Sequence, residues 1–254
     1  MTVKKRRALV EERVLRLGEV HYASLAREFE VSEMTIRRDI DRLEELGIVR
    51  RVTGGAIALP RKVDEPSFHT RVVEAPDSKA HIAEAVVNML HPEETVILDS
   101  GSTVLAVARA LRGRQLGLTI ITPSLLAAIE LSDEPDTTVI VTGGALRAEE
   151  LSLTGADAVD TFAHYNADAF VMGVAGVHVG RGLSDYHRGE SAVKKAAIAA
   201  SDRVIVAVDG TKLGRSTLVN IAPVSSADVI VCDAAEDDAV VTGLRGHGID
   251  VVCV

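Results

Sequence analysis

Short runs of apolar, largely β-branched residues recur from residue 94 to the end of the chain, and they restrict the possible folds more than any other feature. The runs are ETVILD, LTIIT, TTVIVTGG, ADAFVMGVAGV, RVIVAVDG, ADVIVCD and IDVVCV. Segments of helical character lie between several of them, such as TVLAVARALRG, PSLLAAIEL and ESAVKKAAIAAS. Continuous apolar strands that alternate with helices are typical of a mostly parallel sheet covered on both faces. The sequence therefore predicts an α/β domain.

The first sixty residues follow a helical pattern instead. Val10 and Val14 repeat at helical spacing, and Gly18 is placed to end that helix. Ser32 is suited to cap a later helix, which Gly47 is expected to close. We therefore predict a separate small domain at the N-terminus.

Between the two patterns, PRKVDEPSFHTRVVEAPDSKA contains three prolines and no sustained periodicity. Such a segment is typical of a linker. We predict a small domain over residues 1–58, a linker over residues 59–77 and the α/β domain over residues 78–254.

The two parts of the chain differ in the sign of their charge. Residues 1–62 contain 14 Lys and Arg against 10 Asp and Glu, a net of +4, whereas the remainder contains 14 against 27, a net of −13. The total of −9 argues against a uniformly basic nucleic-acid-binding protein. A basic head joined to an acidic body indicates a nucleic-acid-binding module attached to another domain.

Cysteine and hydropathy patterns exclude several other classes. Only Cys232 and Cys253 are present, and neither has the spacing of a metal ligand. No run approaches the length of a membrane span, and no secretory leader is recognisable. We therefore expect a cytoplasmic protein without a metal, a cofactor or a membrane partner.

The stretch VSEMTIRRDIDRLEELGIVRRVTGGA predicts a surface that binds DNA. Ile36 and Ile40 share one helical face, whereas Thr35 and Arg38 lie on the opposite one. Two helices joined by a tight turn, the second with Ser, Thr and Arg near its N-terminus, match a helix-turn-helix. The following IVRRVTGGAIAL has the character of a β-hairpin wing with a glycine turn. The residues predicted to contact DNA are Ser32, Thr35, Arg37, Arg38, Arg50, Arg51, Gly54 and Gly55.

These residues differ in the contact expected of them. Arg37 and Arg38 are candidates for guanine edges or phosphates, because a guanidinium can bind either one bidentately. Ser32 is expected to hold a phosphate, as is Thr35. Asp41 and Arg42, deeper in the helix, are expected to be only solvated.

The α/β part carries a candidate anion site. ETVILDSGSTVLAVARAL is typical of a strand, a polar turn and a helix, and the free N–H groups of such a helix attract phosphate or carboxylate. An ordinary capped helix is the alternative. Other strand ends carry glycines and charged residues that should converge at one sheet edge. The candidate ligand-binding residues are Asp99, Ser100, Gly101, Ser102, Thr103, Thr122, Gly143, Gly144, Arg147, Glu190, Asp209 and Lys212.

Both parts resemble one family. VSEMTIRRDIDRLEELGIVRRVTGGA resembles the N-terminal signature of the DeoR-type bacterial transcriptional regulators, with Thr53 where the family commonly has histidine. LDSGST, TGGALR, GRGLS and DGTK resemble the second domain of that family, whose fold is similar to ribose-5-phosphate isomerase and coenzyme A transferases. The resemblance implies a winged helix-turn-helix joined to an effector-binding domain.

The resemblance also implies a function. It implies a transcriptional regulator, usually a repressor of a carbon-metabolism operon, that binds double-stranded operator DNA as a homo-oligomer. A phosphorylated sugar or related metabolite would be the effector, bound by residues 100–103, Asp209 and Lys212. Asp39 would be structural and would fix the neighbouring arginines.

Two alternatives remain. Asp209, Glu190 and Lys212 would suit the acid and base groups of a sugar-phosphate isomerase-like enzyme with an accessory DNA-binding head. A winged helix can also act as a protein-interaction module. The basic surface of the head favours DNA over both. We expect no catalytic residue, since the histidines at positions 164, 178 and 187 lack a paired nucleophile or a metal-ligand spacing.

Overall fold

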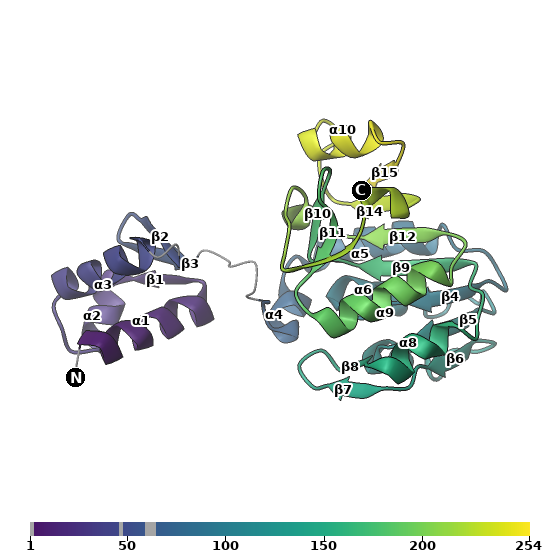
Figure 1. Cartoon of the computed structure of the whole chain (residues 1–254), viewed down its shortest axis with the longest axis horizontal. Coiled ribbons are helices and arrows are strands. Elements are labelled where there is room, and N and C mark those ends of the chain that lie inside the picture. Colours follow the sequence, from purple (N-terminus) through teal and green to yellow (C-terminus); the bar gives the residue numbers. More distant parts are fainter. Residues whose placement is uncertain (1–2, 46–47, 59–64) are drawn as a thin grey trace. The chain divides into compact units, whose positions relative to one another are not determined.

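The computed structural model describes residues 3–45, 48–58 and 65–254. The chain divides into two compact units, Met1–Asp64 (the first unit) and Glu65–Val254 (the second unit), each with its own apolar core. Figure 1 shows both units, which are described separately below.

The first unit is a winged helix-turn-helix, as predicted. Its elements are α1 (Val3–Leu17), β1 (Glu19–His21), α2 (Tyr22–Glu28), α3 (Glu33–Glu45), β2 (Val49–Val52) and β3 (Gly55–Ala58). The strands form an antiparallel sheet in the order β1-β3-β2. Gly18 ends α1 with φ of +75°, and the Ser32 hydroxyl caps α3 by accepting from the Thr35 N–H at 3.2 Å. Gly47, the residue expected to close α3, lies outside the described residues.

The core of the first unit follows the helical periodicity of the sequence. Ile36, Ile40 and Leu43 of α3 are fully buried against Val10 and Val14 of α1. Since residues three and four apart share one face of a helix, burying this face leaves the other side of α3 in solvent.

The predicted linker over residues 59–77 is too long. Residues 59–64 lie outside the described residues, but residues 65–77 belong to the second unit and contain α4 (Phe68–Val73) and the start of α5 (Pro76–Val87). The prolines were misleading because Pro76 occupies the first turn of a helix, where its missing N–H has no cost. Ser67 caps α4 by accepting from the Thr70 N–H at 3.1 Å.

A seven-stranded parallel sheet organises the second unit. Its strand order is β15-β14-β12-β9-β4-β5-β6, and each apolar run noted in the sequence supplies one strand. The strands are β4 (Thr95–Leu98), β5 (Thr119–Thr122), β6 (Thr138–Val141), β9 (Ala169–Gly173), β12 (Val204–Ala207), β14 (Val229–Cys232) and β15 (Asp250–Cys253). The predicted α/β fold is therefore confirmed.

Helices cover both faces of this sheet. One face packs on α5, α6 (Ser102–Leu111) and α7 (Leu125–Leu131), and the other packs on α8 (Ala156–Phe162), α9 (Arg188–Ala199) and α10 (Ala239–Arg245). Figure 1 shows α9 in front of the sheet and α5 behind it. Successive strand residues belong to different cores, with Val96 and Leu98 in one and Ile97 in the other. Burial on both faces explains why the strands are apolar throughout.

Two smaller sheets complete the second unit. β10 (Gly176–His178), β11 (Gly182–Asp185) and β13 (Val219–Ala222) form an antiparallel sheet, and β7 (Ala145–Arg147) pairs with β8 (Ser152–Thr154). Short 3₁₀ turns occupy Gly210–Lys212 and Val224–Ser226. In the part of the chain that the structure describes, no helix has the length and apolar character needed to cross a bilayer.

Candidate nucleic-acid interface and ligand site

The two adjacent arginines near the start of α3, Arg37 and Arg38, have different surroundings. Arg38 is exposed and, within residues 3–45, 48–58 and 65–254, its side chain has no hydrogen bond or ion pair. Arg37 is also exposed, but its guanidinium carbon lies 4.7 Å from the centroid of the Tyr22 ring, which is buried at the start of α2. Stacking on an aromatic face restricts the guanidinium to fewer orientations than an unpartnered one has.

The wing arginines also differ. Arg50 is exposed and, among the described residues, forms no ion pair or hydrogen bond through its side chain. Arg51 lies 2.7 Å from Asp41 and 2.7 Å from Glu44, and its backbone N–H donates to Glu44 at 2.9 Å. These two carboxylates raise the pKa of Arg51. The expectation that Asp41 is only solvated is therefore wrong, because it joins the recognition helix to the wing.

Asp39 has partners that the sequence did not indicate. Its buried carboxylate accepts from Arg6 at 2.6 Å and lies 3.5 Å from Arg7, both in α1. Asp39 is structural, as implied, but it binds α1 and not the arginines beside it in α3. A residue and its immediate neighbour point to different sides of a helix, which explains the error.

The glycine turn of the wing depends on both glycines for different reasons. Gly54 has φ of +84°, a conformation that side chains rarely adopt. At Gly55 a Cβ atom would lie 2.0 Å from the carbonyl oxygen of Val20, so only glycine lets β3 approach β1. The Tyr22 N–H donates to the Gly54 carbonyl at 3.0 Å, which joins the start of α2 to the turn.

The predicted ligand residues of the second unit gather at one edge of the central sheet. Residues 99–103 follow β4, Thr122 ends β5, residues 143–144 follow β6, and residues 209–212 follow β12. All of these strands are parallel, so their carboxyl ends face the same way. Gly101, with φ of +116°, immediately precedes α6, and the N–H groups of its first turn are directed toward this edge.

Several of these residues already have internal partners. Thr122 is fully buried, donates to the Leu98 carbonyl at 2.7 Å and accepts from the Ser124 N–H at 3.0 Å. Asp209 caps its own 3₁₀ turn by accepting from the Thr211 N–H at 3.1 Å. Lys212 is half-buried and, in the described part of the chain, makes no side-chain hydrogen bond or ion pair.

The glycine pair that follows β6 has a structural role in this fold. At Gly144, which has φ of +116°, a Cβ atom would lie 2.4 Å from the Thr154 carbonyl oxygen. The Gly143 N–H donates to the Thr161 hydroxyl at 3.4 Å. Both glycines therefore serve the packing of β7, β8 and α8.

Asp99 is buried in an ion pair that the sequence did not indicate. Its carboxylate accepts from the Lys194 ammonium and from the Gly173 N–H, the latter at 3.1 Å. Lys194 also lies 3.3 Å from Asp185. Burial raises the pKa of Asp99 to about 6, against the opposing effect of Lys194. Burial alone would lower the pKa of Lys194, but the charges of Asp99 and Asp185 raise it instead.

Arg147 and Glu190 also form ion pairs. Arg147 lies 2.7 Å from Glu190 and 2.6 Å from Glu65, and Glu190 accepts from the Ser152 hydroxyl at 2.6 Å. Arg71 of α4 contacts both Glu65 and the buried carboxylate of Glu150. We define the polar cluster as the side chains of Glu65, Arg71, Asp99, Arg147, Glu150, Ser152, Asp185, Glu190 and Lys194.

The polar cluster also contains a set of acidic groups with metal-ligand spacing. Glu65, Asp185 and Glu190 each bring a carboxylate oxygen within 4.8 Å of the others. Each of these carboxylates already lies within 3.3 Å of Arg147 or Lys194, and a metal ion placed among them would be repelled by these two positive charges. The donor set therefore does not favour a metal.

Sequence reasoning missed six members of the polar cluster: Glu65, Arg71, Glu150, Ser152, Asp185 and Lys194. The first two lay in the segment interpreted as a linker. Lys194 carried a signal, because it is flanked in α9 by the buried residues Val193 and Ala197, and a lysine on a buried helical face requires a partner.

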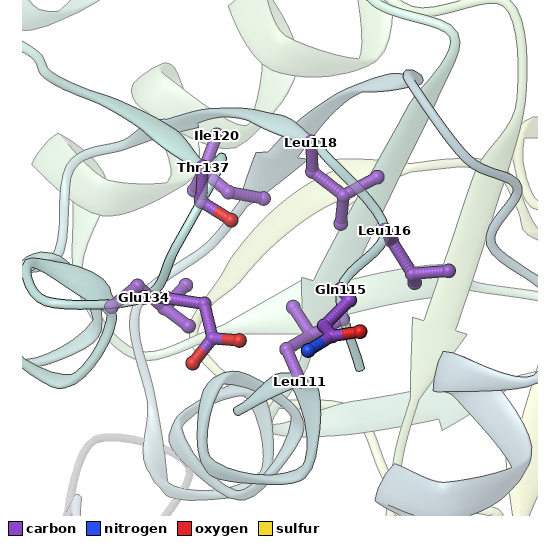
Figure 2. A pocket seen from close by; sticks show the side chains of 8 residues that line it. Leu111, Gln115, Leu116, Leu118, Ile120, Glu134 and Thr137 are labelled. Carbon is purple, nitrogen blue, oxygen red and sulfur yellow. The ribbon is translucent and has the colours of Figure 1, made fainter. Parts of the chain in front are cut away.

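A separate pocket lies at the opposite edge of the sheet. Figure 2 shows its lining of leucines from α6 and the segment before β5, together with Gln115, Glu134 and Thr137. Leu118 immediately precedes β5 and Thr137 precedes β6, so the pocket lies near the amino ends of these strands. Its apolar lining lacks the cations needed for an anionic ligand.

The fold and the two sites define a DNA-binding protein that carries a separate ligand-sensing unit. The family model for the DeoR-like helix-turn-helix domain matches residues 6–62, and the model for the DeoR C-terminal sensor domain matches residues 74–234. The chain therefore belongs to the DeoR family of transcriptional regulators.

Similar proteins have names consistent with this family. The chain is 31% identical to the HTH-type transcriptional regulator GolR of Listeria innocua serovar 6a, over 89% of each chain. It is 32% identical to the glycerol-3-phosphate regulon repressor of Escherichia coli K12, over 94% of each chain. The prediction of a regulator, and not of an isomerase-like enzyme, is confirmed by the family and by these relatives.

A solved structure gives a more limited similarity. Ribose 5-phosphate isomerase A from Methanocaldococcus jannaschii is 18% identical, covers 54% of each chain and superposes with a TM-score of 0.41. The fold described above rests on the strand order and packing of this chain.

Proposed function

We propose that the protein is a repressor that binds operator DNA through the first unit. A phosphorylated sugar, bound at the carboxyl ends of the central strands of the second unit, releases it from the operator. The observation that carries DNA binding is the pair of exposed arginines, Arg38 on α3 and Arg50 on the wing, without partners among the described residues. Cations of this kind bind the phosphate backbone of DNA. The name of the glycerol-3-phosphate regulon repressor supports a repressor of carbon metabolism.

The proposed DNA contacts are divided between two elements. Ser32, Thr35, Arg37 and Arg38 belong to the start of α3, which would enter the major groove. Arg50, Arg51, Gly54 and Gly55 belong to the wing and would contact the adjacent backbone. Homo-oligomerisation is part of the proposal, because paired half-sites require paired heads.

The proposed effector site uses groups that remain available at the sheet edge. The N–H groups and hydroxyls at residues 100–103 would receive a phosphate, and Lys212 would add positive charge. Asp99, Arg147, Glu190 and Asp209 would orient the sugar directly or through the polar cluster. Relief of repression requires that the effector prefer the form of the protein that binds operator poorly.

The test is operator binding by fluorescence anisotropy, with and without a panel of phosphorylated sugars. Arg38→Ala should weaken specific binding by about 1–3 kcal/mol and reduce its salt dependence. Arg42→Ala is the matched control, because Arg42 is exposed on the same helix but paired with Glu45 at 2.5 Å. Equal affinities of the wild type and Arg38→Ala for operator DNA would contradict the proposal that α3 enters the major groove. Lys212→Ala should retain DNA binding but lose the response to the effector.

A further inference from the structure

Glu65 is the first residue of the second unit, and its carboxylate lies between two guanidinium groups. Nη2 of Arg147 is 2.6 Å from Oε2 of Glu65, and Nη2 of Arg71 is 3.3 Å from Oε1. The three side chains are between 14% and 17% exposed. The pairs are therefore largely shielded from water but can be reached from it.

The polar cluster around this carboxylate holds more negative than positive groups. Three cations, Arg71, Arg147 and Lys194, are surrounded by five carboxylates, those of Glu65, Asp99, Glu150, Asp185 and Glu190. A further anion added to this cluster would be repelled, because like charges interact strongly where water is excluded. An anionic ligand that binds Arg147 must therefore replace a carboxylate.

Glu65 is the carboxylate that the fold holds least. Asp99 and Asp185 lie at strand ends and share Lys194, and Glu190 lies in the first turn of α9 and is bonded to Ser152. Glu150 is only 4% exposed. Glu65 lies outside any helix or strand, and its side-chain contacts among the described residues are those with the two arginines.

We propose that Arg71 and Arg147 form a second anion-binding site, separate from residues 100–103, that Glu65 occupies it in this structure, and that a second anionic group of the effector replaces Glu65. The inference rests on the proposed function, since it takes the effector to be a phosphorylated sugar, and it adds that this sugar carries two anionic groups. Effector and Glu65 exclude each other, which gives the ligand a preference for one of two states. Glu65 is the first residue of the second unit, so its displacement frees the start of that unit.

The contacts of α4 would transmit this change. Arg71 Nε donates to the Pro66 carbonyl at 3.1 Å, and the Lys79 ammonium of α5 donates to the carbonyls of Arg71 and Glu74. Losing Glu65 removes one of the two carboxylate partners of Arg71. The segment before α4 then keeps only the Pro66 contact with the Arg71 side chain.

Calorimetric titration of the full chain with inorganic phosphate tests the site. Glu65→Gln removes the competing charge at nearly constant size, so phosphate should bind about tenfold more tightly than to the wild type. Glu74→Gln, the same change at an exposed residue of the same segment, should leave the affinity unchanged. Adding Arg71→Gln to Glu65→Gln should abolish the gain. Unchanged phosphate affinity in Glu65→Gln, or no binding to that variant, overturns the proposal.

Hydrogen exchange provides a second readout that does not depend on affinity. Amides of α4, such as that of Arg71, which bonds to Ser67 at 3.0 Å, should exchange faster when phosphate is added to the wild type. The central strands should be unaffected, which shows that the fold is intact. If the exchange rates of the α4 amides are the same with and without phosphate, phosphate does not displace Glu65.

The outcomes separate this inference from the proposed function. If phosphorylated sugars release operator DNA equally well from the wild type and Glu65→Gln, the proposed function stands and the anion exchange fails. If Glu65→Gln gains phosphate affinity but no phosphorylated sugar releases DNA, the anion exchange stands and the proposed relief of repression fails.

Discussion

In the first unit, Arg38 and Arg50 are exposed and lack ion-pair partners among the described residues, whereas in the second unit Arg147 and Lys194 are each held by two carboxylates. An exposed cation without a partner can bind a phosphate without breaking a protein contact. A shielded cation with two partners must exchange one of them. The first arrangement suits a long polyanion bound in a salt-dependent way, and the second suits a small ligand recognised by competition.

The largest effect should come from removing a cation that carboxylates surround. Lys194→Ala leaves Asp99 and Asp185 without their shared partner in the interior, which should lower the free energy of unfolding by about 3–5 kcal/mol. Urea unfolding of the full chain measures this. Lys195→Ala is the control, because Lys195 is the exposed neighbour in the same helix and should change little. A similar loss in both variants would show that the cluster does not depend on Lys194.

A smaller effect should follow from the pKa of Asp99, which burial raises from 3.8 to about 6. The folded protein therefore holds this proton more tightly than the unfolded chain does. The contribution of Asp99 to stability should be greatest below about pH 4 and should decrease as the pH rises to about 6, by about 3 kcal/mol in total. Asp99→Asn cannot ionise, so its unfolding free energy should lack this component. Parallel pH profiles for the two proteins would contradict the assignment.

The smallest effect concerns the one predicted DNA-contacting arginine that stacks on a ring. Tyr22→Leu removes the aromatic face beneath Arg37 while keeping an apolar side chain, and should weaken operator binding by about 1 kcal/mol. Tyr22→Phe keeps the face and should bind like the wild type. Anisotropy measures the affinities, and thermal unfolding of both variants shows whether the first unit remains folded. Equal weakening by Phe and Leu would assign the effect to the hydroxyl.

Much of the fold could be predicted because its signals are local. Each apolar run became a central strand, and the cap at Ser32 and the stop at Gly18 lie where the sequence placed them. The sheet of β10, β11 and β13 was not predicted, since its strands lack the continuous apolar runs of the central strands: β10 and β11 begin with glycine, and β13 contains Asn220. Short strands without such a run leave no clear signal in the sequence.

The site was only partly predictable, for a different reason. That the strand ends would converge followed from the parallel sheet. The ion pairs did not follow, because their members are far apart in the chain: Lys194 and Asp99 are separated by 95 positions, and Arg147 and Glu65 by 82. A single sequence gives the charges but not their pairing, and the pairing is what distinguishes an available cation from an occupied one.

Because of Asp39, the stability of the first unit depends on residues near the start of α1. The carboxylate lies inside the recognition helix, yet the charges that balance it, Arg6 and Arg7, belong to the first turns of α1. A chain shortened past these residues would retain every predicted DNA contact and still carry an uncompensated charge beneath α3. Removing the amino-terminal residues, or fusing a rigid tag there, should therefore change operator binding even though no predicted DNA contact is removed.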